Sequence, residues 1–514
     1  MAIRAGDIQY GPWTGGVWYS RPEEDVAVEE ISAMENTRIQ AAGAVEKRLG
    51  TASYKSAANI SLDPTLTMCA QFTVPPASPY VVIVAGTAIY KYASGWSAIT
   101  GSVTVTADDD HTFEWAADEG SGTLFATNGV DVPFKWTGSG NAAVVDVDSR
   151  FDRADHVAHW DNRVWWGSTG TDYDRLWFSD TADIDTVGAT SFYQFGHRIT
   201  ALVSTRNALS VHTSGGIFTM VPTGNSQIPY QQQQRTSRAA LHGRAVVVLP
   251  GDRQLMVRED GIYEWDGGDD VEKKSFALDL GYWPHLNASR LVESFSLYYP
   301  AEAEAWFWVP YGTGQTEMNH IIIYSDRHDC WFGPYSGSGA YFDRNCAALI
   351  DQTPHAGTLD SSGDIGGKLE DHAPANTYND DDDTADGTAI RAYFRTGAPA
   401  PSGSAERVRW LYSRTYFDAT GDYNITVNQE SSGISGTTRT LNVAGGGFIL
   451  NSSKTDEEEL GTVRMLAQDL DMSEYDPHSS LKFTNNSIDE LFRIRRTHPV
   501  YKDIGKKRRV KAGV

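Results

Sequence analysis

Short apolar runs separated by turn residues set the hydrophobic pattern between residues 199 and 265. The runs are rich in Val, Ile and aromatic residues and cover residues 208–212, 217–221, 245–249 and 261–265. Ser-Gly-Gly, Pro-Gly-Asp and Asp-Gly bound them, and such sequences favour turns because Gly and Asp tolerate a positive φ. The pattern therefore predicts β-strands joined by tight turns. A strand, a turn and a strand with an aromatic end recur, which is typical of a radially repeated sheet.

A loose period extends this pattern over residues 51–374. Aromatic or aliphatic hairpin ends recur at intervals of 40, 42, 43, 44, 66 and 38 residues. These markers are Trp96, Trp136, Phe178, Val221, Trp265, Trp331 and Leu369. Propeller blades of four strands recur at about 40–50 residues, so five intervals lie at or near that period and one carries an insertion. We expect an all-β fold with a six- or seven-bladed β-propeller; a sandwich or barrel also needs many strands but predicts no such spacing.

The segments on either side of this repeat differ from it. Residues 1–50 are predicted to form an N-terminal arm, within which residues 22–38 have some helical composition. Residues 375–388 are acidic and rich in turn formers, which indicates a solvated linker. Strand-like runs then fill residues 389–505 and predict a C-terminal β-sandwich-like domain. Residues 506–514 form a basic tail.

Length and charge narrow the class of protein. At 514 residues the chain is long enough for two or three domains. Its 15 Trp and 24 Tyr suit half-buried sheet faces, where one ring edge packs and the other meets a polar partner. With 43 basic and 67 acidic residues the formal net charge is −24, which disfavours binding to nucleic-acid phosphates.

Cysteine usage and hydropathy bear on the compartment. The three cysteines give neither an even-numbered disulfide framework nor a C-x-x-C metal spacing, so we expect synthesis in a reducing cytoplasm. The N-terminal region lacks an apolar signal core, and the chain has no run of about 18 apolar residues. The sequence thus predicts neither a cleaved signal nor a membrane span.

No pattern of catalytic or cofactor-binding residues stands out. The segments 179–183 and 325–331 resemble the Asp-boxes of propeller hydrolases but lack their Gly and Thr. His156, His159, His320 and His328 lack the helical spacing of a zinc protease and are interpreted as structural. The acids from 380 to 386 suggest calcium, yet Tyr393 stands where an EF-hand needs its bidentate Glu. We therefore predict no enzyme activity, no cofactor and no metal site.

One family resemblance does emerge. Asn36-Thr37-Arg38-Ile39 followed by Gly43-x-Val45-x-Lys47-Arg48-x-Gly50 resembles the N-terminal signature of tail hub and nozzle proteins of short-tailed bacteriophages, the packaged-DNA stabilisation or tail tubular B group. The motif positions are Asn36, Arg38, Gly43, Lys47, Arg48 and Gly50. Segments 176–180, 199–221 and 258–267 resemble the family as well, so the likeness covers roughly residues 15–335.

The resemblance implies a virion structural protein without catalytic residues. Family members form a six-fold ring in the virion tail, assembled in the host cytoplasm, with the portal or its adaptor on one side. Tail tip, needle or fibre proteins follow on the other side, and duplex DNA passes through without sequence-specific binding. The ring retains the packaged genome and opens for ejection. The alternative is a receptor-binding or polysaccharide-degrading propeller tail protein.

The basic tail offers a candidate docking element. Its cations are Lys506, Lys507, Arg508, Arg509 and Lys511. An acidic chain holds DNA off over a screening length of about 8–10 Å, whereas an acidic neighbouring ring is already within reach. We expect the tail to dock on a neighbouring subunit or ring, the other interpretation being a flexible solvated end.

Overall fold

The computed structural model describes most of the chain. The described residues are 5–54, 65–73, 79–106, 112–118, 120–145, 151–170, 172–181, 184, 186–225, 228–337, 342–358, 368–375, 377–380, 387–401, 408–418, 420–421, 423–431, 434–443, 465–472 and 475–504. Their regular structure consists of strands and short 3₁₀ helices. None of the helices in these ranges is long and apolar enough to cross a membrane.

Seven four-stranded antiparallel sheets follow one another between Leu66 and Asp371 in the described ranges. The first four are β7 (Leu66–Phe72), β8 (Tyr80–Ala85), β9 (Ala88–Tyr92), β10 (Trp96–Ala98); β11 (Glu114–Asp118), β12 (Thr123–Thr127), β13 (Phe134–Trp136), β14 (Ala143–Val144); β15 (Ala154–Trp160), β16 (Arg163–Thr169), β17 (Asp172–Ser179), β18 (Val187–Gln194); and β19 (Ile199–Ser204), β20 (Leu209–Thr213), β21 (Gly216–Asn225), β22 (Ile228–Thr236). The other three are β23 (Val246–Val248), β24 (Gln254–Arg258), β25 (Gly261–Trp265), β26 (Val271–Lys273); β27 (Phe295–Tyr299), β28 (Glu304–Val309), β29 (His320–Ser325), β30 (Cys330–Tyr335); and β31 (Arg344–Ile350), β32 (Thr353–Thr358), β33 (Leu369–Asp371) with β6 (Ala52–Ser53).

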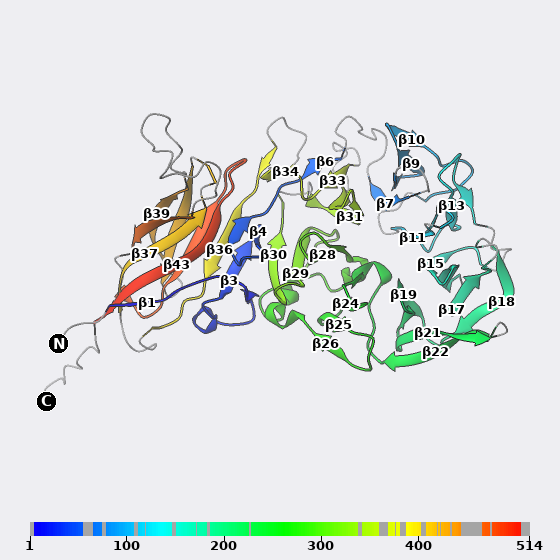
Figure 1. Cartoon of the computed structure of the whole chain (residues 1–514), viewed down its shortest axis with the longest axis horizontal. Coiled ribbons are helices and arrows are strands. Elements are labelled where there is room, and N and C mark those ends of the chain that lie inside the picture. Colours follow the sequence, from blue (N-terminus) through cyan, green and yellow to red (C-terminus); the bar gives the residue numbers. More distant parts are fainter. Residues whose placement is uncertain are drawn as a thin grey trace, which may run out of the picture.

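The sheets close into a ring. The first strand of each sheet contacts the first strand of the next, from β7 through β11, β15, β19, β23 and β27 to β31, and β31 contacts β7 again. The remaining strands of each sheet lie progressively further from the centre (Figure 1). The predicted all-β fold is confirmed, and the closed ring is a β-propeller.

The seventh sheet is completed by a strand from the other end of the sequence. In β6, Ser53 pairs with Glu370 and Ala52 pairs with Asp371 of β33. Chain entry and exit therefore share one sheet, which ties the ring shut with backbone hydrogen bonds.

Each of the seven hairpin markers lies in a different sheet. Trp265, for example, is in β25, and Trp331 is in β30. The long interval between these two has two causes: Trp331 stands on a fourth strand instead of a third, and an insertion separates β26 from β27. The insertion carries the 3₁₀ helices η3 (Ser275–Leu278), η4 (Trp283–His285) and η5 (Leu291–Glu293), while η2 (Gly243–Ala245) leads into β23.

Two larger sheets combine both ends of the chain into a second domain, here called the two-sheet domain. One contains β1 (Ala5–Asp7), β4 (Thr37–Ile39), β5 (Val45–Lys47), β37 (Val408–Asp418), β40 (Met465–Asp471), β41 (Tyr475–Asp476) and β43 (Arg493–Asp503). The other contains β2 (Gly16–Val17), β3 (Glu30–Glu35), β36 (Ala392–Thr396), β38 (Asn424–Ser431), β39 (Ile434–Asn442) and β42 (Ser480–Asn485).

Residues 1–50 are therefore not a separate arm in the part that the structure describes. Their strands pair with C-terminal strands, as β3 does with β36 and β5 with β43. The region with helical composition forms the short 3₁₀ helix η1 (Glu23–Asp25) and the strand β3 instead. Pairing with two neighbouring strands overrides a weak helical preference, because backbone propensity is small beside tertiary packing.

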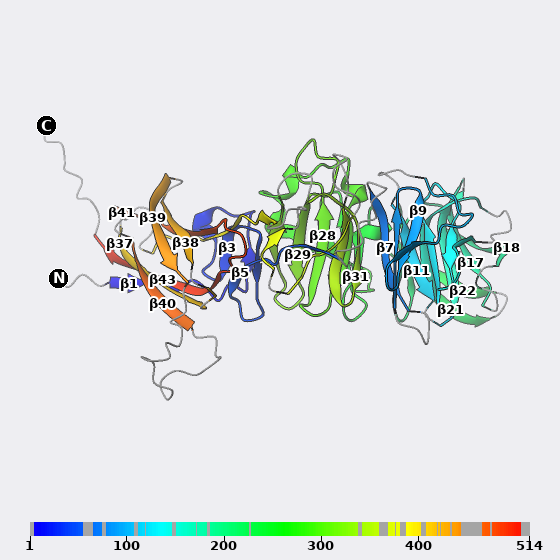
Figure 2. The ribbon, with the colours of Figure 1, turned by 90° about the horizontal axis from the view of Figure 1, so that it is seen from above.

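The two-sheet domain forms one end of the molecule and the propeller forms the other, and the two domains pack against each other (Figures 1 and 2). β2, β3 and β4 contact β30 of the sixth sheet, and one hydrophobic core runs through both domains. Within that core Phe394 stacks on Phe483 at a ring separation of 4.8 Å. Within the predicted linker, residues 375–388, β34 (Asn379–Asp380) pairs with β35 (Thr388–Ala389), which extends one residue past its end.

Candidate functional site

Several of the residues that carry the family resemblance lie at the junction between the two domains. Asn36 follows β3 with a φ of 53°, a conformation that Asn tolerates better than most residues. Its side-chain oxygen accepts hydrogen bonds from Arg48 Nε and from the backbone N–H of Ser336, both at 2.8 Å. Its amide nitrogen donates to the carbonyl of Arg391 at 2.9 Å. One side chain thus joins the N-terminal strands, the end of the sixth propeller sheet and the start of the C-terminal region.

Arg48 holds the segment that the sequence predicts to be a solvated linker. Its Nη1 and Nη2 donate to the two carboxylate oxygens of Asp380 at 2.8 and 2.6 Å. Nη2 also donates to the carbonyl of Ser336 at 3.0 Å, and Nη1 to that of Leu49 at 2.9 Å. Asp380 is buried, so at this residue the linker prediction is wrong; residues 381–386 lie outside the described ranges.

Arg38 makes a second set of ionic contacts across the junction. Its Nη2 lies 3.0 Å from Glu302 Oε2 and 3.4 Å from Glu304 Oε1, at the hairpin between β27 and β28. Burial raises the pKa of Glu304, and the Arg38 guanidinium partly opposes that shift. Trp306 Nε1 also donates to Glu304 at 2.9 Å. A buried carboxylate is thus held by one cation and one neutral donor.

Lys47 is buried on the C-terminal side of the junction. Its Nζ donates to Asn485 Oδ1 at 3.1 Å and to the carbonyl of Ser487 at 2.7 Å. Burial, together with the nearby Arg48 charge, lowers the pKa of Lys47 to about 8.

The two motif glycines allow segments to approach closely. Gly43 has a φ of +75°, and a Cβ there would lie 2.6 Å from Pro12 Cβ. A Cβ on Gly50 would lie 1.8 Å from the carbonyl oxygen of Asn379, the residue before Asp380. Asn36, Arg38 and Arg48 therefore join the propeller to the two-sheet domain, and Gly50 packs against the segment that leaves the propeller. Gly43 and Lys47 instead contact residues of the two-sheet domain itself. The predicted docking residues of the basic tail, 506–511, lie outside the described residues.

A second polar site occupies the axis of the propeller. A cavity of about 340 Å³ touches the first strand of all seven sheets, from Cys69 in β7 to Cys346 in β31. A larger cavity of about 630 Å³ adjoins it, and Arg244 lines both. The walls of the larger cavity are polar and include Asn128, Ser168 and Thr200.

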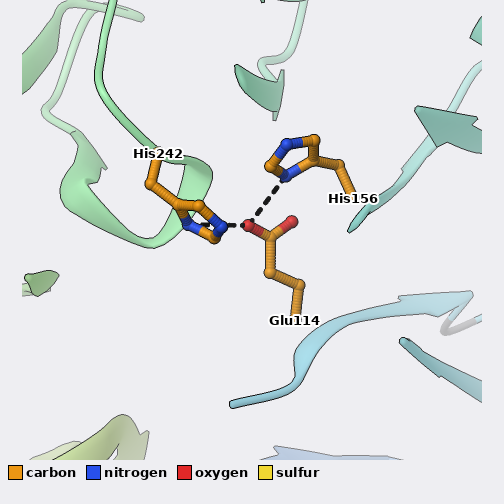
Figure 3. Close-up of side chains that lie close together, drawn as sticks. All are labelled: Glu114, His156 and His242. Carbon is orange, nitrogen blue, oxygen red and sulfur yellow. Dashed lines mark hydrogen bonds and ion pairs between the residues drawn. The ribbon is translucent and has the colours of Figure 1, made fainter. Parts of the chain in front are cut away.

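Glu114, His156 and His242 converge beside these cavities (Figure 3). Glu114 opens β11, His156 lies in β15, and His242 precedes η2. His156 Nδ1 is 3.0 Å from Glu114 Oε1, and His242 Nδ1 is 3.4 Å from the same oxygen. His156 and Glu114 are buried, whereas the His242 side chain is 25% exposed. Among the residues that the structure describes, these three form a group able to offer one ligand atom each to a metal ion.

The two histidines differ in electrostatics. Burial alone would lower the pKa of His156, but its contact with the Glu114 carboxylate outweighs burial and raises that pKa. Burial holds the pKa of His242 well below its usual range, with a further contribution from charge on His156 and Arg244. His242 Nδ1 accepts a hydrogen bond from the backbone N–H of Arg244 at 3.3 Å. Gly243 leaves room for the carboxylate, because a Cβ there would lie 2.4 Å from Glu114 Oε1.

Sequence reasoning missed this group. It noted His156 but interpreted it as structural, and it did not consider Glu114 or His242. Glu114 and His156 are 42 residues apart, which is about one blade repeat, so no short motif connects them. The available signal was positional: both lie in the first strands of consecutive sheets, and first strands meet at a propeller axis.

Comparisons with known proteins give only distant likenesses. No protein-family model and no curated protein matches the chain. PorZ, a surface component of the type-IX secretion system of Porphyromonas gingivalis, is similar at 14% identity and a TM-score of 0.38, over 70% of this chain and 44% of that one. BamB from Moraxella catarrhalis is similar at 11% identity and a TM-score of 0.35, over 63% of this chain and 97% of that one. The WD40 β-propeller domain of Doa1 is similar at 10% identity and a TM-score of 0.36, over 63% of this chain and 96% of that one. These scores are too low to carry an argument, so the propeller assignment rests on the closed ring of sheets.

Proposed function

We propose that this chain is a structural protein of a bacteriophage virion, which forms a hexameric tail nozzle or hub ring around the DNA conduit. The observation that carries the proposal is the junction. Three of the six residues that resemble the family signature, Asn36, Arg38 and Arg48, contribute to one buried contact between the propeller and the two-sheet domain. Because these signature residues act together at the domain junction, their resemblance to the family supports the proposal more strongly than isolated sequence matches would.

The proposal includes the finer architecture. Counting each four-stranded sheet as a blade gives a seven-bladed propeller, with β6 as the closing strand. The two larger sheets form a β-sandwich-like domain to which both ends of the chain contribute.

Rigid coupling of the two domains suits a ring subunit. A closed ring uses a heterologous interface whose rotation must return to its start after six copies. If a subunit bent between its domains, the rotation that relates neighbouring subunits would vary, and the ring would not close reliably at six copies. The buried ion pairs of Arg48 and Arg38 support a fixed angle.

The charge of the chain is compatible with a DNA conduit. A formal net charge of −24 per copy repels the phosphates of duplex DNA, so passing DNA would not adhere to the wall. In this proposal the portal or adaptor ring contacts one face and tail tip, needle or fibre proteins contact the other.

Particle symmetry tests the proposal. We expect negative-stain images of the purified full chain to show a six-fold annulus, and labelled antibody to mark the tail end of virions. Asp380→Asn, which weakens the junction, should reduce ring formation, whereas Asp469→Asn at an exposed ion pair should not. A three-fold particle at the virion periphery, or polysaccharide cleavage by the purified chain, would favour a receptor-binding or depolymerising tail protein instead.

A further inference from the structure

We propose that Glu114, His156 and His242 bind a zinc ion at the axis of the propeller. This inference is independent of the proposed virion function. The three side chains come from the second and third sheets and from the segment that leads into the fifth. They offer one carboxylate oxygen and two imidazole nitrogens, all within 4.8 Å of one another.

Two of the three separations between the ligand atoms match a tetrahedral zinc site. With bonds of about 2.0–2.1 Å, ligand atoms in a tetrahedron lie about 3.3 Å apart. Glu114 Oε1 is 3.0 Å from His156 Nδ1 and 3.4 Å from His242 Nδ1. The ligand atoms of the two histidines are no more than 4.8 Å apart, so these side chains would approach each other by up to about 1.5 Å to place an ion between the three atoms.

The hydrogen bond at His242 shows which form of its imidazole faces Glu114. Nδ1 of His242 accepts the backbone N–H of Arg244, so this nitrogen carries a lone pair and no proton. A carboxylate oxygen at 3.4 Å then faces a second acceptor, which is repulsive unless a positive ion lies between them. On binding, zinc would take the lone pair of His242 Nδ1, so the 3.3 Å hydrogen bond from the Arg244 N–H would break. Zinc would also replace the proton that His156 Nδ1 donates to Glu114, and that proton would pass to solvent.

The surroundings leave room for a fourth ligand. His156 and His242 line the 630 Å³ cavity, which can supply water to an open coordination position. Two imidazoles and one carboxylate suit zinc better than calcium or magnesium, which prefer oxygen ligands. Arg244 is a competing cation beside the site, and its Nη1 donates to the carbonyl of Asn345 on β31 at 3.3 Å.

A zinc titration of the full chain tests the site. After removal of metal with a chelator, we expect one Zn²⁺ per chain by calorimetry, and the visible absorption spectrum of tetrahedral Co²⁺ in its place. His242→Ala should weaken Zn²⁺ binding at least 100-fold. His159→Ala is the matched control, because His159 is also partly exposed, lies in the same strand as His156 and faces Asp118 instead.

A second variant distinguishes the loss of a zinc ligand from a loss of binding caused by misfolding. Glu114→Gln keeps the size of the side chain but removes its charge, and it should weaken Zn²⁺ binding as well. The proposal is overturned if the folded wild-type chain takes up no Zn²⁺. It is also overturned if both variants bind Zn²⁺ as the wild type does, since the ion would then sit elsewhere. None of these results depends on whether the chain forms a ring.

Discussion

Arg48 and Asp380 form a buried two-pronged ion pair across 332 residues of chain. The planar guanidinium matches both carboxylate oxygens at once, which fixes direction as well as distance. The side chains are only 2% and 11% exposed, so each charge depends on the other for compensation. This pair attaches the start of the chain to the segment that leaves the propeller.

We expect Asp380→Asn to lower the free energy of unfolding by about 3–5 kcal/mol, because it leaves the Arg48 charge buried without a counter-charge. Urea denaturation followed by circular dichroism measures the change. Asp469→Asn provides the control, since the Arg414–Asp469 pair has the same two-pronged geometry but is exposed. Equal losses in the two variants would contradict the assigned importance of burial.

We expect Gly50→Ala to destabilise the chain by about 1–3 kcal/mol, because the new methyl group would force the Asn379 backbone away. Thermal unfolding measures this effect. At Gly95 a Cβ would meet no atom within 4 Å, so Gly95→Ala should leave the melting temperature unchanged or slightly higher. A neutral Gly50→Ala would show that the two segments do not pack this closely.

Trp265→Ala should cost about 3–5 kcal/mol of stability through loss of packing in the core. Trp265 is one of the hairpin ends that mark the repeat in the sequence, and in the structure it is only 2% exposed. Its Nε1 also donates to the carbonyl of Gly268 at 2.7 Å. Leu280, at 72% exposure, is the control, and Leu280→Ala should change stability by less than about 0.5 kcal/mol. Similar denaturation midpoints for the two variants would refute the prediction.

Lys47 should make stability depend on pH above neutrality. Its folded pKa of about 8 lies below the 10.5 of a free lysine, so between these values the unfolded chain binds the extra proton. Stability therefore rises with pH through this window, by up to about 1.4 kcal/mol per pH unit, and below pH 8 the full cost of the buried charge is present.

Lys47→Met removes this titration. The stability difference between wild type and variant should shift in favour of the wild type from pH 8 to pH 10, as measured by urea unfolding at each pH. The raised pKa values of buried tyrosines affect both proteins alike and cancel in the difference. A constant difference across this range would mean that Lys47 titrates normally.

The sequence predicts the parts of the fold that are local. Hairpins repeat within about 40 residues, so markers such as Trp265 and Trp331 reveal one sheet each. The pairings of β6 with β33 and of β3 with β36 join segments more than 300 residues apart, and no local pattern encodes them. The predicted N-terminal arm differs from the structure for this reason.

The same distinction holds for the sites. The family resemblance identifies Asn36, Arg38 and Arg48 as residues of interest. Nothing in their spacing shows that Asp380 would pair with Arg48 or that Glu302 would pair with Arg38. The Glu114 group was missed because its members become neighbours only when the first strands of several sheets surround one axis.

The division of the two-sheet domain between both chain ends has a consequence for biosynthesis. Strands β1 to β5 leave the ribosome before the propeller does, yet β36 and β43, with which β1, β3 and β5 pair, are made after it. At about 5–20 residues per second, these early strands wait roughly 20–100 seconds for their partners. Throughout that time the apolar side chains of β3 and the charged side chain of Arg48 have no native environment. The propeller can close on itself as soon as β33 is made, whereas the other domain is completed only after the whole chain has been translated.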